Sequence, residues 1–270
     1  MYKLIASDMD GTLLNRDGKV TQRTKRALKR CMEAGAKFSL SSGRMPEAME
    51  SIANEIGANA PLIMFNGAMI YDMRTSETVF KKAIPAETAT AICRMAEEMN
   101  LYIQTYPGKG YFCPEHTDLT YEYEKRIGVR AQEVHMPLSK WNTQDAVKLL
   151  ALGHTAEEIE QAKARFQKAF PHGVSFMCSH PTYLEIVAEG VDKWQAMEEL
   201  ARHAGVRREE TLAFGDGQND IPMLLAAGAG YAMKNSVAAK LDEMLVAPPF
   251  DQDGVAQVLE KFLAAGVIGG

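Results

Sequence analysis

The chain has 270 residues, of which 46% are hydrophobic and 24% are charged, a composition typical of a soluble globular protein with one large or two smaller domains. Its net charge of −5 argues against nucleic acid as a partner, because nucleic-acid binding needs basic surfaces. The first residues lack the pattern of a secretory leader, no apolar run is long enough to span a membrane, and the four cysteines form no C-x-x-C pair, so we expect a cytoplasmic protein with no membrane partner.

The first part of the chain alternates between strand and helix signals. Short apolar runs predict buried strands, and Thr21 and Pro46 are typical of helix starts. This alternation predicts a parallel sheet with helices on its faces. We expect strands at 4–7, 36–41 and 62–65, and helices at 21–35 and 46–57.

The middle of the chain follows another pattern, in which alternating strands and hairpins predominate. We interpret this section as a separate α+β layer with an antiparallel sheet. We expect hairpins at 68–80 and 174–187, further strands at 101–105, 111–113 and 146–152, and helices at 86–99, 119–126 and 156–170.

The first pattern returns after Asp192, which with Gln195 resembles a helix capping box. Strands at 211–214 and 230–233, and helices at 193–203, 223–225 and 255–263, are expected there. An inserted domain explains this change and return better than two domains in tandem. We therefore predict an α/β fold with a Rossmann-like, doubly wound parallel-sheet core at 1–82 and 187–270 and an inserted α+β cap at 83–186.

Polar residues follow four of the predicted core strands. In an open α/β sheet, ligands bind outside the carboxyl ends of the strands, so these residues are expected to share one crevice. They are Asp8 and Asp10, Ser42 and Gly43, Asn66, and finally Asp216, Asn219 and Asp220, with Lys193 at the start of a core helix.

Four clustered carboxylates would repel one another unless a cation were present. A ligand set of oxygens without cysteine or histidine suits Mg²⁺, which often bridges to a phosphate. Lys193, the Ser42 hydroxyl and helix N-terminal amides would then hold phosphate oxygens. Taken singly, Ser42-Gly43 fits an ordinary helix entry, Asn66-Gly67 a turn, and Lys193 a solvated helix start. Their joint order favours a site.

These motifs resemble those of the haloacid dehalogenase-like superfamily of phosphohydrolases, in particular its Cof-type branch with a cap of the C2B kind. The first family motif, D-x-D-G-T, stands at 8–12, and the second, Ser-Gly-Arg, ends at Arg44. The third is Lys193, and the fourth, G-D-x-x-N-D, stands at 215–220. Asn66-Gly67 and the late Asn235 also match the branch.

The resemblance implies a role for each matched residue. Asp8 would be the nucleophile that forms an aspartyl-phosphate, and Asp10 would act as general acid and base. Ser42, Gly43, Lys193 and Asn219 would bind the phosphoryl group. Mg²⁺ would be bound by Asp8, by the backbone carbonyl of Asp10 and by Asp216. Asp220, Asn66, Arg44 and Asn235 would support the site.

The expected function is therefore a Mg²⁺-dependent phosphatase of small phosphorylated metabolites, such as sugar phosphates. A phosphomutase and a receiver-like signalling module that carries a phospho-aspartate are the alternatives. The cap is expected to act as a lid that Arg44 meets, with Tyr106 and His116 on its substrate-facing loops. Trp194 and Lys234 stand where the family often has glycine, which puts substrate preference in doubt. The sequence indicates neither the substrate nor the oligomeric state.

Overall fold

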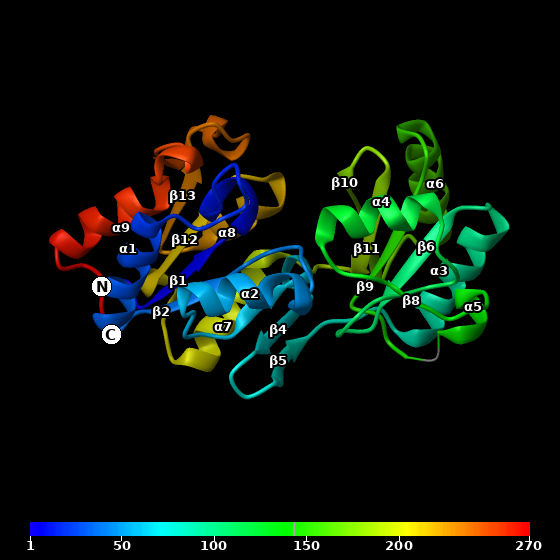
Figure 1. The fold of residues 1–270 in the computed structure, drawn as a ribbon, viewed down its shortest axis with the longest axis horizontal. Helices are drawn as coiled ribbons and strands as arrows, with labels where there is room; N and C mark the ends of the chain where they lie inside the picture. Colours follow the sequence, from blue (N-terminus) through cyan, green and yellow to red (C-terminus); the bar gives the residue numbers. More distant parts are fainter. Residues whose placement is uncertain (143) are drawn as a thin grey trace. The chain divides into compact units, whose positions relative to one another are not determined.

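A computed structural model describes residues 1–142 and 144–270, with Ser179 by its backbone alone. The described chain divides into two compact units (Figure 1). Unit 1 comprises Met1–Gly43, Met49–Phe80 and Asp192–Gly270, and unit 2 comprises Arg44–Ala48 and Lys81–Val191. No helix among the described residues is both long and apolar enough to cross a membrane.

Unit 1 is built on a five-stranded parallel sheet, as the alternating pattern predicted. The strand order is β14-β13-β12-β1-β2, so the first strand of the chain lies inside the sheet. The strands are β1 (Leu4–Ser7), β2 (Lys37–Leu40), β12 (Thr211–Gly215), β13 (Ala229–Met233) and β14 (Leu245–Ala247).

Helices cover both faces of this sheet (Figure 1). On one face, Leu4 and Ala6 of β1 pack in a buried apolar cluster with residues of α7 and α8. On the other, the ring of Tyr231 in β13 lies 5.9 Å from that of Phe262 in α9, and α9 packs beside α1. The bounds are α1 (Gln22–Glu33), α2 (Pro46–Ile56), α7 (Lys193–Ala204), α8 (Ile221–Ala226) and α9 (Gly254–Ala264).

The third predicted strand does not extend the parallel sheet as expected. β3 (Leu62–Met64) pairs antiparallel with β4 (Met69–Asp72), which continues to β5 (Glu77–Lys81). Its link to β2 is a single parallel bridge between Ser41 and Ile63. The chain reverses directly after β3 through Phe65 and Asn66, which both have positive φ, so β4 returns as the main hydrogen-bonding partner of β3.

Unit 2 contains a mostly antiparallel six-stranded sheet in the order β10-β11-β9-β6-β7-β8. Its apolar face packs with α3 and α6 in a second buried cluster, to which Ile103, Leu149 and Ile186 belong. The strands are β6 (Tyr102–Tyr106), β7 (Phe112–Cys113), β8 (Gln132–Glu133), β9 (Lys148–Leu152), β10 (Val174–His180) and β11 (Tyr183–Ala188). The helices are α3 (Ala86–Glu98), α4 (Asp118–Ile127), α5 (Leu138–Trp141) and α6 (Ala156–Ala169).

The predicted fold class, a parallel core and a separate antiparallel cap, is confirmed. β8, α5 and β14, with two, four and three residues, were not predicted. Asp192 caps α7 by accepting a hydrogen bond from the Gln195 backbone N–H at 2.8 Å. The Gln195 side chain instead donates to the Asp192 carboxylate, so the expected capping box is only half formed.

Candidate active site

The ends of three neighbouring strands bring the first candidate residues together. β1 pairs with β12 on one side and with β2 on the other. The Asp8 backbone N–H donates to Phe214 O at 2.9 Å, which continues the ladder past the end of β1. Adjacent strands are therefore followed by Asp8, Ser42 and Asp216 at their carboxyl ends, where α/β proteins bind ligands.

Lys193 lies at the centre of the acidic residues. Its side chain is fully buried, and Nζ donates to Asp8 Oδ1 at 2.6 Å and to Asp220 Oδ1 at 2.5 Å. Burial alone would lower the pKa of Lys193, but the two carboxylates raise it above its ordinary value. The amine is therefore a fixed positive charge, and the interpretation of Lys193 as a solvated helix start is wrong.

Asp220 and Thr12 orient the acidic loop that follows β12. Asp220 Oδ2 accepts hydrogen bonds from the backbone N–H groups of Asp216 and Gly217, each at 2.9 Å. The Thr12 hydroxyl donates to Asp216 Oδ1 at 3.1 Å. No role was predicted for Thr12 from the sequence. Its position in the first motif, two residues after Asp10, could have indicated that it lies near the acidic residues.

Three of the four predicted carboxylates form a group that could hold a cation. One oxygen each from Asp8, Asp216 and Asp220 lies within 4.8 Å of the others. Burial, opposed in part by Lys193, raises the pKa of Asp8 to about 7. Burial, together with the charge of Asp220, raises the pKa of Asp216 to about 6. Crowded carboxylates of this kind fit a hard divalent cation with oxygen ligands.

Two glycines allow the loops of the site to approach one another. Gly11 has φ +77°, and a Cβ there would lie 2.5 Å from Asp216 Oδ2. Gly67 has φ +102°, and a Cβ there would lie 2.1 Å from the backbone oxygen of Asp192, which caps α7. A larger residue in place of Gly11 would therefore push Asp216 away from the first motif. A larger residue in place of Gly67 would push the start of α7, with Lys193, away from the loop after β3.

Asn66 joins the second and fourth motifs. Its backbone has φ 57°, a left-handed conformation that asparagine tolerates better than most residues. Its N–H donates to Ser42 O at 3.0 Å, and its side-chain oxygen accepts from Asn219 Nδ2 at 3.0 Å. A Cβ on Gly43 would lie 3.0 Å from the Asn66 amide. Asn219 therefore donates to Asn66, and its expected contact with a phosphoryl group stays a prediction.

The remaining core candidates lie on more exposed turns. Asp10 is exposed in the turn after β1, and its side chain does not belong to the carboxylate group described above. Asn235 and Lys234 are exposed after β13, where the Lys234 N–H donates to Ala247 O at 3.0 Å. Trp194 packs against the core cluster of unit 1 under Arg208, whose guanidinium carbon lies 5.3 Å from the ring centre.

Arg44 belongs to the short segment of unit 2 that interrupts unit 1. Its Nη1 donates to Ala48 O at 3.5 Å within that segment.

Tyr106 is not a loop residue, which corrects the sequence-based choice. It ends β6 and is 1% exposed, its ring stacks on that of Tyr111 at 4.9 Å, and Lys148 Nζ lies 4.6 Å from its ring centre. Its hydroxyl donates to Gln104 Oε1 at 3.1 Å. Tyr106 is therefore part of the interior of unit 2.

His116 does lie in a loop, between β7 and α4, but its side chain is only 6% exposed. Its two ring nitrogens lie 2.8 Å from carboxylate oxygens of Glu124 and Glu133. Burial would lower the pKa of His116, but the two carboxylates raise it above its ordinary value. The buried ring holds the loop to α4 and β8, so His116, like Tyr106, is part of the packing of unit 2.

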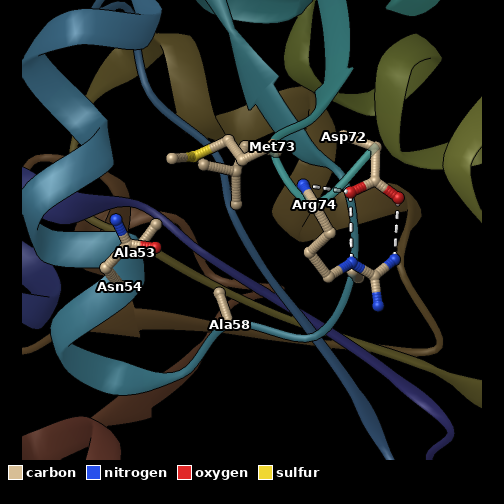
Figure 2. Close-up of a pocket in the computed structure, with 8 residues that line it drawn as sticks. Ala53, Asn54, Ala58, Asp72, Met73 and Arg74 are labelled. Carbon is tan, nitrogen blue, oxygen red and sulfur yellow. Dashed lines mark hydrogen bonds and ion pairs between the residues drawn. The ribbon is translucent and has the colours of Figure 1, made fainter. Parts of the chain in front are cut away.

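A small pocket of ≈ 90 Å³ lies elsewhere in unit 1, lined in part by Asn54, Met73 and Arg74. Figure 2 shows the Arg74 guanidinium held by Asp72, whose oxygens accept from Nε at 3.1 Å and from Nη2 at 2.7 Å. This ion pairing lowers the pKa of Asp72. Because Tyr71 pairs with Leu62, Asp72 lies at the amino end of β3, opposite the end that carries Asn66. The pocket is therefore separate from the acidic site.

Comparisons with known proteins agree with this geometry. Residues 5–259 match the family of haloacid dehalogenase-like hydrolases. The HMP-PP phosphatase of Yersinia pseudotuberculosis is 28% identical over 272 residues, covering 98% of this chain and 97% of that protein. A haloacid dehalogenase-like hydrolase from Bacteroides thetaiotaomicron superposes with a TM-score of 0.88 at 29% identity, covering 97% of this chain and 100% of that one. A subclass IIB sugar phosphatase of the same superfamily superposes with a TM-score of 0.80 at 24% identity, covering 98% of this chain and 100% of that one. At this identity, the likeness supports the fold alone.

Proposed function

The chain belongs to the haloacid dehalogenase-like hydrolase family and is a phosphatase of that family. On this premise, we propose that it hydrolyses small phosphorylated metabolites with Mg²⁺ through an aspartyl-phosphate. The supporting observation is the position of Asp8. Its carboxylate is buried at the end of β1 and lies against the Lys193 amine and the oxygens of Asp216 and Asp220. A phosphoryl group brought there would meet a nucleophile and a positive charge together.

The proposed reaction has two steps. In the first, an Asp8 oxygen bonds to phosphorus, the bond to the leaving oxygen breaks, and Asp10 donates a proton to the departing alcohol. In the second, Asp10 removes a proton from water, which attacks phosphorus and releases inorganic phosphate and the Asp8 carboxylate. The exposed turn that carries Asp10 suits a residue that exchanges protons with both alcohol and water.

Asp8, Asp216 and the backbone carbonyl of Asp10 would hold the metal. When bound, Mg²⁺ neutralises phosphoryl oxygens and orients them for in-line displacement. Asp220 has both oxygens engaged, one with Lys193 and one with two backbone amides. We therefore assign Asp220 to holding Lys193 and the loop in place, and Ser42 with Asn219 to the phosphoryl oxygens.

We propose a small substrate on the basis of the relatives, which include an HMP-PP phosphatase and a subclass IIB sugar phosphatase. The phosphate-binding residues belong to unit 1, and they recognise a group that all such substrates share. We therefore propose that unit 2, an inserted cap with a sheet of its own, supplies the choice among leaving groups.

The function is tested by release of inorganic phosphate from an aryl phosphate and from a panel of phosphorylated metabolites. We expect multiple turnovers with Mg²⁺ and loss of activity in a chelator. Asp8→Asn should abolish turnover while the circular dichroism spectrum is kept, and the exposed Asp17→Asn should behave as wild type. One equivalent of phosphate at most would indicate a receiver-like module, and an isomeric phosphate product would indicate a mutase. Full turnover by Asp8→Asn would rule out the proposed nucleophile.

A further inference from the structure

Exposed apolar side chains are concentrated in one stretch of unit 1, which includes the edge strand β14 of the parallel sheet. Of the eight large hydrophobic side chains that are exposed in the described part of the chain, five lie between residues 225 and 246, at 41–49% exposure. Scattered exposed hydrophobic residues need no explanation, but a group of them marks an interaction surface. The five are Leu225, Val237, Leu241, Leu245 and Val246.

This apolar surface includes both faces of β14, the edge strand. Residues that pair in register point to the same face of a sheet. Leu245 pairs with Tyr231, whose ring faces α9, and Val246 pairs with Ala232, which packs in the cluster that includes Met223 of α8. Leu245 therefore lies on the α9 side and Val246 on the α8 side, so a partner at this edge would cover both.

The backbone of β14 also has hydrogen-bonding groups directed outward. The carbonyl of Ala247 accepts from the Lys234 N–H at 3.0 Å, so Ala247 faces β13. Along a strand, successive residues direct their N–H and C=O groups to alternate sides. The N–H and C=O of Val246 therefore point away from β13, toward the open edge, where a further strand could pair.

We propose that β14 pairs with β14 of a second copy of this chain, antiparallel about a two-fold axis at Val246. The two five-stranded sheets would then join into one. Val246 would exchange both of its backbone hydrogen bonds with Val246 of the other copy, and each Leu245 would lie beside the other copy's Ala247. Such an isologous contact is the usual arrangement in homodimers.

Charge favours this antiparallel arrangement over other orientations. Asp242 and Glu243 are exposed just before β14, whereas Lys234 is exposed beside its other end. Antiparallel pairing brings the acidic end of each copy toward the Lys234 end of the other. Strand spacings of roughly 5 Å put these charges within reach of a lysine side chain. Parallel pairing would instead place the acidic ends of the two copies together, which is unfavourable.

The same geometry limits the strength of the dimer. Pro248 and Pro249 follow β14 and have no N–H to donate, so the ladder between copies ends after β14. Stable interfaces bury on the order of 1,000 Å² or more in total. Most of this area must come from the apolar side chains around β14. We therefore expect reversible association in the micromolar range.

Sedimentation equilibrium from about 1 to about 200 µM, a range that spans micromolar affinities, tests the proposal. The wild type should rise from the monomer mass of 29.8 kDa toward twice that value. Val246→Lys places a charge on the edge, and Val246→Pro removes the outward N–H while an edge strand tolerates proline. Each should weaken association at least about tenfold, whereas Met136→Lys, at an exposed site of unit 2, should not.

Charge reversal tests the orientation. Lys234→Glu should weaken the dimer, and adding Glu243→Lys should restore it. A wild type that stays at 29.8 kDa throughout overturns the proposal, as does a dimer that survives both Val246 variants with an unchanged circular dichroism spectrum. Failure of the charge rescue overturns the antiparallel register. None of these readouts depends on phosphatase activity.

Discussion

Replacement of Lys193 by methionine removes the positive charge at the centre of the acidic site and keeps a side chain of similar length. Nζ is fully buried and contacts Asp8 and Asp220 at 2.6 and 2.5 Å. Removing one partner of a buried ion pair typically costs about 3–5 kcal/mol, because the other charge is left buried without compensation. Lys193 serves two carboxylates, so we expect the upper part of that range in metal-free protein at pH 8. In a domain of this size, this loss corresponds to a fall in Tm of roughly 10 °C or more.

The penalty should depend on pH in a defined direction. Burial raises the pKa of Asp8 from 3.8 to about 7 in the folded protein, although Lys193 opposes this rise. The folded state thus binds this proton more tightly than the unfolded state. The corresponding stability is present at low pH and is lost as pH rises through about 7. Without Lys193 the pKa of Asp8 rises further, so the variant should lose less stability at pH 5 than at pH 8.

The assay is scanning calorimetry in a chelator at pH 5 and pH 8, followed by titration with Mg²⁺. The metal should stabilise Lys193→Met more than wild type, because the carboxylates no longer have the amine beside them. Lys29→Met is the matched control: Lys29 pairs with Glu33 at 3.7 Å but is 74% exposed, so it should cost at most about 0.5 kcal/mol. A loss below about 1 kcal/mol for Lys193→Met at pH 8, or equal losses at the two pH values, would refute the reasoning.

Three further predictions follow from the same geometry. Asp10→Asn should lower kcat by at least about 100-fold and leave the affinity for Mg²⁺ unchanged. Asp216→Asn should weaken Mg²⁺ binding measured by calorimetry. Equal losses of Mg²⁺ affinity in the two variants would show that the Asp10 side chain is a metal ligand. Gly67→Ala places a Cβ 2.1 Å from a backbone oxygen and should cost more than about 3 kcal/mol in chemical denaturation. Gly18→Ala, which has positive φ but open space around it, should cost only about 1–2 kcal/mol, and equal losses would contradict the steric argument. Tyr106→Ala should destabilise unit 2 by about 3–5 kcal/mol and leave relative kcat/KM values across substrates unchanged; a changed preference would return Tyr106 to the substrate site.

Local interactions explain why much of this protein could be predicted from its sequence. Thr21 caps α1 and Asp192 caps α7 through hydrogen bonds to backbone groups three residues away. Buried runs such as 4–7 and 211–215 form strands of the parallel sheet, and the carboxyl ends of such strands necessarily share one edge. The caps involve only a few neighbouring residues, and the common position of the strand ends follows from the general geometry of a parallel sheet. The sequence alone therefore determined the fold class and the grouping of Asp8 with Asp216.

Only the tertiary structure decided how distant side chains meet. Lys193 lies 185 residues from Asp8 in the sequence, and Asn219 lies 153 from Asn66, so no local pattern specifies these bonds. The same holds for the partner of β3, for the burial of Tyr106 and for the exposed edge at β14. These three features depend on which helices and strands pack together in the folded unit. These outcomes follow from the energy of the whole packed unit, whereas a residue pattern records only the preferences of its own segment.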